Sequence, residues 1–240
     1  MLILAVNTTS EAGGAALYED EQCLASVSND GPANKYSVSL FEMVERLLAE
    51  VNRRDTSPLG GLADIELYAV ANGPGSFTGI RVGLAVAQAW ATAFARPVKG
   101  ISVLEAMVEA AQPPTSHALP ILDAHRGEFY LGMFQKGAGA RWIPAGQGLV
   151  LKQEALKRQV HEQLRAGQDF TVLARAHDQA TLALRAGLPD CLRWRTVEGP
   201  LLEAIARIAR RAAREGDLEA PGQLDAYYIR RTDAELNLAR

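Results

Sequence analysis

Short apolar runs alternate with longer segments of helical spacing along the first half of the chain. Residues 2–6 form a compact apolar run, which is typical of a buried strand. Residues 14–18 and 23–27 predict two more strands, because they follow at short spacing around an acidic turn. Helical spacing then predicts a helix at 36–53, followed by a strand at 67–71 and a second helix at 77–95. The predicted order is three strands, a helix, a strand and a helix.

The second half of the chain repeats this order. Strands are predicted at residues 119–122, 128–134 and 146–151, a helix at 152–165, a strand at 170–174 and a helix at 177–185. An amphipathic helix at 201–215 and a mostly polar tail at 222–240 follow. Two successive units of this order describe the actin/Hsp70/sugar-kinase (ASKHA) α/β fold. We expect an N-terminal domain at residues 1–104 and a C-terminal domain at 105–240 that includes the closing helix and the tail.

Both helices of the first half carry more apolar surface than one core-facing side requires. The first has a stripe at helical spacing that further residues widen: Val38, Phe41, Val44, Leu48 and Val51, then Leu40, Met43 and Leu47. The second is apolar on all sides. Because a helix that is apolar all round must be buried all round, we predict that a second polypeptide covers these helices, with a wholly internal second helix as the alternative. The predicted interface residues are Tyr36, Leu40, Met43, Leu47, Val82, Gly83, Val86, Ala89 and Trp90.

A glycine-rich segment connects the predicted strand at residues 67–71 to the predicted helix at 77–95. It follows a strand and opens a helix, where backbone N–H groups can bind an anion. Its GxGxxxG spacing differs by one residue from the dinucleotide-binding fingerprint, and it lacks the GK[ST] ending of a P-loop. The alternative is a tight turn in which Ser76 or Thr78 caps the helix. The residues concerned are Gly73, Pro74, Gly75, Ser76, Phe77, Thr78, Gly79 and Arg81.

The remaining motifs predict neither a catalytic residue nor a metal site. His161 and Glu162 begin like the HExxH motif of zinc peptidases, but Arg165 stands where the second histidine is required and would repel a cation. Ser76 does not lie in the GxSxG sequence of a nucleophile elbow. A metallopeptidase or serine hydrolase is therefore the weaker hypothesis.

Two charged clusters have a structural and a functional interpretation. Residues 123–128 (DAHRGE) follow a strand and could form a catalytic cluster, a phosphate-facing turn or a salt-bridged hairpin, of which the hairpin is the commoner case. Arg207, Arg210, Arg211 and Arg214 share one side of the closing helix. A stripe that faces tRNA is one interpretation, and a solvated face diluted by nearby glutamates is the commoner one.

Composition adds little that favours a particular partner. The formal net charge is −3, so the chain lacks the basic excess of a dedicated nucleic-acid-binding protein. The first residues lack the basic flank and long apolar stretch of a signal peptide, and no segment is long enough to span a bilayer. A cytoplasmic protein without membrane contact is expected.

Five sequence segments resemble the TsaB (YeaZ) family, whose members assist the transferase that makes threonylcarbamoyladenosine beside the tRNA anticodon. They are residues 2–9 (LILAVNTT), 72–84 (NGPGSFTGIRVGL), 100–105 (GISVLE), 123–130 (DAHRGEFY) and 228–236 (YIRRTDAEL). The resemblance implies a non-catalytic partner of the TsaD transferase, with TsaD's fold but without its catalytic groups. It further implies a homodimer or a heterodimer with TsaD through the two N-terminal helices, an assembly with the ATPase TsaE, and indirect or weak contact with tRNA.

The turn at Asn7, Thr8, Thr9 and Ser10 departs from this family's pattern. In the ASKHA fold the first hairpin turn binds nucleotide phosphates. The family commonly has aspartate where this chain has Asn7. A neutral amide is a poorer ligand for Mg²⁺ than a carboxylate. Tyr36 stands where the family often has histidine. We therefore expect no cofactor of the chain's own, although ATP or ADP could be shared at the partner interface. The alternative function is an ATPase or small-molecule kinase that uses this turn.

Overall fold

The computed structural model describes residues 1–29, 36–54 and 59–229, which form two compact units. Unit 1 combines Met1–Ala106 with Gly199–Ala226, and unit 2 combines Met107–Glu198 with the described residues from Tyr227 onward. Helix α3 (Val103–Ala111) carries the chain out of unit 1, and the chain returns at Gly199. None of the described helices is long and apolar enough to cross a membrane.

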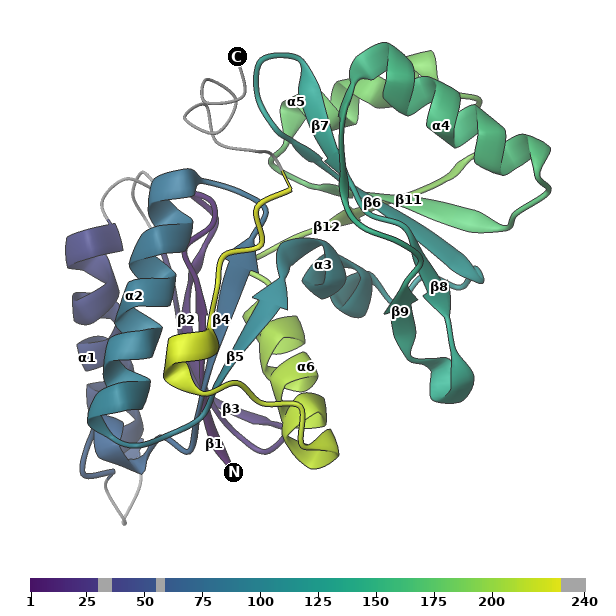
Figure 1. The fold of residues 1–240 in the computed structure, drawn as a ribbon. Helices are drawn as coiled ribbons and strands as arrows, with labels where there is room; N and C mark the ends of the chain where they lie inside the picture. Colours follow the sequence, from purple (N-terminus) through teal and green to yellow (C-terminus); the bar gives the residue numbers. More distant parts are fainter. Residues whose placement is uncertain (30–35, 55–58, 230–240) are drawn as a thin grey trace. The chain divides into compact units, whose positions relative to one another are not determined.

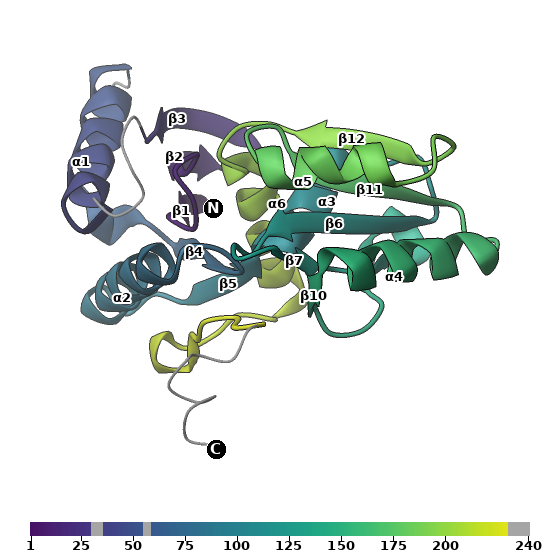
Figure 2. The same cartoon turned by 90° about the horizontal axis from the view of Figure 1, so that it is seen from above.

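Unit 1 is a five-stranded sheet with helices on both faces (Figures 1 and 2). Its elements are β1 (Leu2–Asn7), β2 (Gly14–Glu19), β3 (Gln22–Ser28), α1 (Tyr36–Arg54), β4 (Leu67–Gly73), α2 (Phe77–Ala93), β5 (Val98–Ser102) and α6 (Leu202–Glu215). The strand order is β3-β2-β1-β4-β5. The first three strands are antiparallel neighbours, whereas β4 and β5 run parallel to β1. Helices α1 and α2 cover one face and α6 covers the other.

Unit 2 repeats this arrangement around its own first strand. Its elements are β6 (His117–Asp123), β7 (Glu128–Leu131), β8 (Phe134–Lys136), β9 (Trp142–Pro144), β10 (Leu149–Lys152), α4 (Gln153–Arg165), β11 (Phe170–Arg175), α5 (Gln179–Ala183) and β12 (Arg193–Val197). The main strand order is β10-β7-β6-β11-β12, with the β8–β9 hairpin attached to β6. Strand β6 has an antiparallel neighbour, β7, and a parallel one, β11, as β1 has in unit 1. The predicted duplicated ASKHA fold is confirmed.

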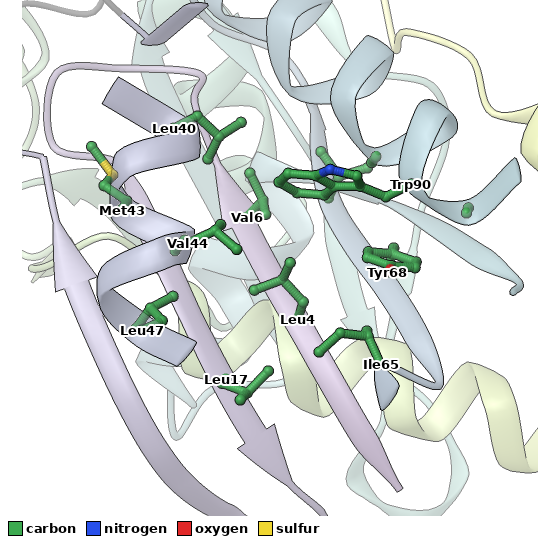
Figure 3. Packing of buried hydrophobic residues seen from close by; sticks show 14 of the residues in the cluster. Leu4, Val6, Leu17, Leu40, Met43, Val44, Leu47, Ile65, Tyr68 and Trp90 are labelled. Atoms are coloured by element: carbon green, nitrogen blue, oxygen red, sulfur yellow. The ribbon is translucent and has the colours of Figure 1, made fainter. Parts of the chain in front are cut away.

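Strand β1 lies at the centre of the unit 1 core. All six of its residues are buried, as expected for a continuous apolar run with helices on both faces. Its alternate residues Leu4 and Val6 pack among side chains of α1 and α2 (Figure 3). Trp90 of α2 packs beside Tyr68 of β4, with their ring centroids 6.0 Å apart. The pleat of one strand thus distributes its side chains between two helical layers.

The structure corrects the predicted domain division. Helix α6 was expected in the second domain, but it packs on β1 and belongs to unit 1. Leu202, Ile205 and Ile208 lie on its buried side. The strong amphipathic pattern identified the helix, but nothing in it specifies which sheet the helix covers. The position of α6 depends on the chain's return to unit 1 at Gly199.

Several element boundaries also differ from the predictions. The expected strand at 128–134 is two strands, β7 and β8, with Gly132 and Met133 between them. Helix α2 ends at Ala93 rather than at residue 95. Strands β5 and β12 and helix α3 were not predicted. Strand β5 contains Lys99 and Gly100, and β12 contains two arginines, so neither has the apolar run that predicts a strand.

Leu40 and Val38 lie two residues apart on α1 but in opposite environments. Leu40 is fully buried beneath the helix, whereas Val38 is 65% exposed. We predict that Leu40→Ala lowers the free energy of unfolding of the isolated chain by about 2–5 kcal/mol, because it leaves a cavity in the core. The control Val38→Ala should change it by about 0.5 kcal/mol or less. Denaturant titration of both variants is the measurement; equal losses would contradict this packing.

Candidate functional site

The turn that follows β1 is held by hydrogen bonds to its own chain. Asn7, Thr8 and Thr9 are all buried. The Asn7 Oδ1 atom accepts hydrogen bonds from the Thr9 backbone N–H at 3.0 Å and from the Thr9 hydroxyl at 2.7 Å. The Asn7 Nδ2 group donates to the carbonyl of Pro200 at 2.8 Å. Both polar atoms of the Asn7 amide are therefore bonded within unit 1.

The glycine-rich segment packs directly on this turn. The Ser76 backbone N–H donates to the Thr9 carbonyl at 2.7 Å, and the Thr8 hydroxyl donates to the Gly79 carbonyl at 2.7 Å. A Cβ atom at Gly79 would lie 1.9 Å from the Thr8 carbonyl oxygen, and one at Gly83 would lie 2.3 Å from the Thr8 hydroxyl. Since no side chain fits at these distances, glycine is required for the approach of α2 to the turn.

The expected helix cap is present at Ser76. Its hydroxyl accepts a hydrogen bond from the Gly79 backbone N–H at 3.3 Å, which satisfies one of the free donors at the start of α2. The alternative interpretation of the segment, a tight strand-to-helix turn with Ser76 as the cap, is confirmed. Phe77 and Arg81 lie beyond it on the surface of α2, with the Arg81 guanidinium 3.7 Å from the centre of the Phe77 ring.

Tyr36 supports the turn from the start of α1. Its phenol donates to the Ser10 carbonyl at 2.8 Å, and its side chain is buried. Burial raises the pKa of Tyr36 to about 12, although a backbone hydrogen bond from Gly13 opposes the shift. The phenol therefore stays protonated near neutral pH and acts as a hydrogen-bond donor that ties α1 to the turn.

Six of the predicted interface residues lie inside the chain's own core. The side chains of Tyr36, Leu40, Met43, Leu47 and Trp90 are buried, and Gly83 faces Thr8. Val82 and Val86 are half-buried at the edge of the core, and Ala89 is exposed. The interface prediction was therefore wrong for those six residues, because the core and the turn after β1 already cover them. A broad apolar stripe on a helix does not show which of its residues pack against the sheet.

An exposed apolar surface does remain on the two helices. We define the helix surface as Val38 and Phe41 on α1 with Val82, Val86 and Ala89 on α2. Phe41 is 48% exposed, and its ring meets the edge of Trp90 with centroids 5.7 Å apart. This contact joins the two helices, so the surface is continuous across them. Val38 and Phe41 belong to the predicted apolar stripe of the first helix but were not among the predicted interface residues.

The spacing of α1 contained a signal that could have separated core from surface. The buried residues follow a regular helical series, and Val38 and Phe41 fall outside it. That series is Tyr36, Leu40, Met43, Val44, Leu47 and Val51. An apolar residue that breaks such a series is a candidate for an exposed contact.

The C-terminal segment of unit 1 covers another side of α2. It runs back along the helix after α6 (Figure 1). Leu224 inserts into the unit 1 core, and its carbonyl accepts a hydrogen bond from the Gln88 side chain at 2.8 Å. The Asn72 side chain donates to the Asp225 carbonyl at 3.3 Å. Part of the excess apolar surface of α2 is therefore covered by a segment that the sequence analysis treated only as a polar tail.

The charged segment of unit 2 forms a hairpin turn between β6 and β7. Asp123 accepts a hydrogen bond from the His125 backbone N–H at 2.7 Å and lies 3.2 Å from the His125 ring. The Asp123 N–H in turn donates to Asp178 at 2.8 Å, at the start of α5. The predicted hairpin is thus confirmed as the structure of this segment.

Arg175 is a buried charged residue that sequence reasoning missed. It ends the apolar strand β11, and burial lowers its pKa to about 10 while the nearby Asp178 opposes the shift. The side chain stays protonated at neutral pH. An arginine inside an apolar strand was the available signal.

The arginines of α6 make ion pairs within unit 1. Arg210 is buried and contacts the Asp20 carbonyl and the Glu21 carboxylate, the latter at 3.2 Å. Arg207 lies 3.8 Å from Glu203, and Arg211 lies 3.7 Å from Glu105. The solvated-face interpretation was therefore wrong for Arg210, which holds the β2–β3 turn.

The described residues contain no group of three or more His, Cys, Asp and Glu side chains placed to hold a metal ion. His161 and Arg165 are both exposed on α4. Most of the tail motif at residues 228–236 lies outside the part of the chain that the structure describes.

Comparison with known proteins places the chain in a family. The family model described as "TsaD: tRNA N6-adenosine threonylcarbamoyltransferase" matches residues 32–182. The tRNA threonylcarbamoyladenosine biosynthesis protein TsaB of Escherichia coli K12 is 31% identical over 235 residues, which cover 96% of this chain and 95% of that protein. TsaB of Bacillus subtilis is 33% identical over 135 residues, 56% of each chain.

A solved structure agrees with the fold. YeaZ from Pseudomonas aeruginosa superposes with a TM-score of 0.72 at 22% identity, over 95% of this chain and 99% of that one. The extent of the E. coli match and the shared fold lead to one assignment: this chain belongs to the TsaB (YeaZ) family.

Proposed function

We propose that this chain is a non-catalytic partner subunit of a TsaD-like transferase in tRNA threonylcarbamoyladenosine biosynthesis. The relatives named TsaB support the pathway. The observation that carries the partner role is the helix surface, on which Val38 and Phe41 expose large apolar side chains beside the half-buried Val82 and Val86. Covering such a surface with a second subunit removes apolar area from water and stabilises the complex.

The proposed occupant of the helix surface is the matching pair of helices on a TsaD-like chain. The TsaD family model matches residues 32–182, a range that contains both α1 and α2. A chain of that family is therefore expected to carry equivalent helices. Two similar surfaces can pair about an approximate two-fold axis, as in isologous dimers. By the same reasoning the helix surface pairs with a second copy of this chain when the TsaD-like partner is absent.

Activation in this proposal is a shift in the partner's conformational population. A subunit that binds the productive conformation of the transferase more tightly favours that conformation without contributing a reacting group. The polar residues Glu42, Glu45 and Arg46 are exposed beside Phe41 and supply a hydrophilic rim. The family resemblance adds a TsaE-like ATPase to the assembly and implies that contact of this chain with tRNA is indirect or weak.

In this proposal nucleotide chemistry is also left to the partner. The side-chain polar atoms of Asn7 and Thr8 are already bonded to protein atoms, and Asn7 offers no carboxylate for Mg²⁺. ATP or ADP that reaches this chain is then shared at the partner interface. The alternative is an ASKHA-type ATPase or kinase that acts through the same turn.

Ala89→Arg tests the docking surface, because Ala89 is exposed and the isolated chain should tolerate the change. We predict that an unpaired guanidinium at this position weakens binding to a TsaD-like subunit by roughly 30-fold or more, equivalent to about 2 kcal/mol. Stimulation of threonylcarbamoyl transfer should fall in parallel. Analytical ultracentrifugation and a transfer assay provide the two measurements.

Ala180→Arg is the matched control, since Ala180 is an exposed helical alanine on α5 of unit 2. It should bind and stimulate like the wild type. Unchanged association of a folded Ala89→Arg variant would remove the helix surface from the proposal.

Nucleotide turnover by the purified chain separates the two functions. We predict no Mg²⁺-dependent hydrolysis of ATP above that of a heat-denatured sample, because Asn7 and Thr8 are committed to internal hydrogen bonds. A phosphate-release assay with and without Mg²⁺ is the measurement. Robust hydrolysis that requires Mg²⁺ and is lost when Mg²⁺ is omitted would support the ATPase or kinase.

A further inference from the structure

The start of helix α6 lacks the usual means of fixing a helix terminus. Its N-cap residue is Leu201, whose apolar side chain makes no capping hydrogen bond and whose backbone is left-handed, with φ at 64°. This is also the point at which the chain has just returned to unit 1, since that return begins at Gly199. The direction in which the chain enters α6 must therefore be set by a contact from elsewhere.

Asn7 supplies such a contact at Pro200. Its side-chain Nδ2 donates to the Pro200 carbonyl at 2.8 Å, and Asn7 is only 1% exposed. The orientation of the amide follows from its partners: the Thr9 N–H can only donate and the Pro200 carbonyl can only accept. An aspartate could accept the hydrogen bonds from Thr9 equally well, but an ionised carboxylate has no hydrogen for Pro200.

The far part of α6 is held by a second polar contact. Arg210 bonds to the Asp20 carbonyl and to Glu21 in the β2–β3 turn. Between Pro200 and Arg210 the helix buries Leu202, Ile205 and Ile208. Apolar packing is not directional, so by itself it permits small shifts and rotations of the helix. Hydrogen bonds at two separate points prevent these movements.

We propose that Asn7 is a positioning residue that fixes where the chain re-enters unit 1 and begins α6. In this role the amide donates a hydrogen bond to Pro200, which an ionised carboxylate at position 7 could not do. The position at which the ASKHA fold places a phosphate-site carboxylate is thereby used for an internal contact. This inference concerns the chain alone and holds whether or not the proposed partner role is correct.

The isosteric variant Asn7→Asp tests the proposal, because it removes the donor to Pro200 and leaves the acceptor for Thr9. At neutral pH we expect the folding equilibrium constant to fall about tenfold or more, since a buried carbonyl loses its partner and faces a negative charge. Hydrogen exchange of the Ile205 amide, which bonds to the Leu201 carbonyl at 3.0 Å, should accelerate more than that of Leu17 and Ala25 in β2 and β3.

A pH series adds a readout specific to the missing donor. Burial and the facing Pro200 carbonyl raise the folded-state pKa of an aspartate at position 7 above the unfolded value of about 3.9, although the hydrogen bonds from Thr9 oppose the rise. The deficit of Asn7→Asp relative to the wild type should therefore shrink as the pH falls through that raised pKa, because the protonated acid again donates to Pro200. The ionisable side chains of the adjoining segments include Tyr36, Glu11, Glu198 and Glu203, and comparison with the wild type at each pH removes the contributions that both proteins share.

Asn29→Asp is the matched control, because the Asn29 side chain also donates to a carbonyl, that of Glu11 at 3.0 Å, but in an exposed setting. It should lower the folding equilibrium constant by less than about threefold. If Asn7→Asp does not fold at neutral pH, recovery of the fold in acid supports the proposal and its absence overturns it. Equal acceleration of exchange in α6, β2 and β3, or stability equal to that of the wild type, would also overturn it.

Discussion

The approach of α2 to the turn after β1 is the contact on which the rest of unit 1 depends. A Cβ atom at Gly79 would lie 1.9 Å from the Thr8 carbonyl oxygen, so the helix and the turn meet backbone to backbone. This approach places Trp90 against Tyr68 and in edge contact with Phe41 of α1. It also determines which side of α2 faces outward. Close packing therefore accounts for the glycines at positions 79 and 83.

The same contact engages the polar side chains of the first turn in hydrogen bonds within the protein. In this chain, the polar atoms of the turn bond to Pro200, Gly79 and one another. These hydrogen bonds order the turn that α1 and α2 pack against. An ordered turn agrees with the proposed role of a subunit that contributes a surface to its partner.

The sequence predicted the duplicated fold because the centre of each unit has unambiguous periodicity. Strand β1 is a continuous apolar run, and α1 and α2 have long helical patterns. The weaker strands β5 and β12 were missed because lysine, glycine and arginine interrupt their apolar residues. Ser76 and Thr78 were predicted as the two candidate caps because capping depends on local sequence, and the structure shows Ser76 in this role.

Features that depend on distant contacts could not be read from local patterns. The bond between Asn7 and Pro200 joins residues 193 positions apart, and Leu224 reaches α2 from the end of the chain. Helix α6 has a clear amphipathic pattern, but the pattern does not show which of the two sheets the helix packs on. For α1 the apolar residues were identified, but the pattern did not separate the buried positions from the exposed ones. Leu40 lies in the core, whereas Val38 lies on the surface.

Hydrogen–deuterium exchange of this chain, alone and mixed with a TsaD-like subunit, tests the central claim most directly. Because helical amides on a covered face exchange more slowly, binding should protect α1 and α2 around Val38, Phe41 and Ala89. The amides of unit 2 on α4 and β12 serve as the internal reference and should be unchanged. Protection confined to unit 2, or a stable complex without added protection in α1 and α2, would contradict the account.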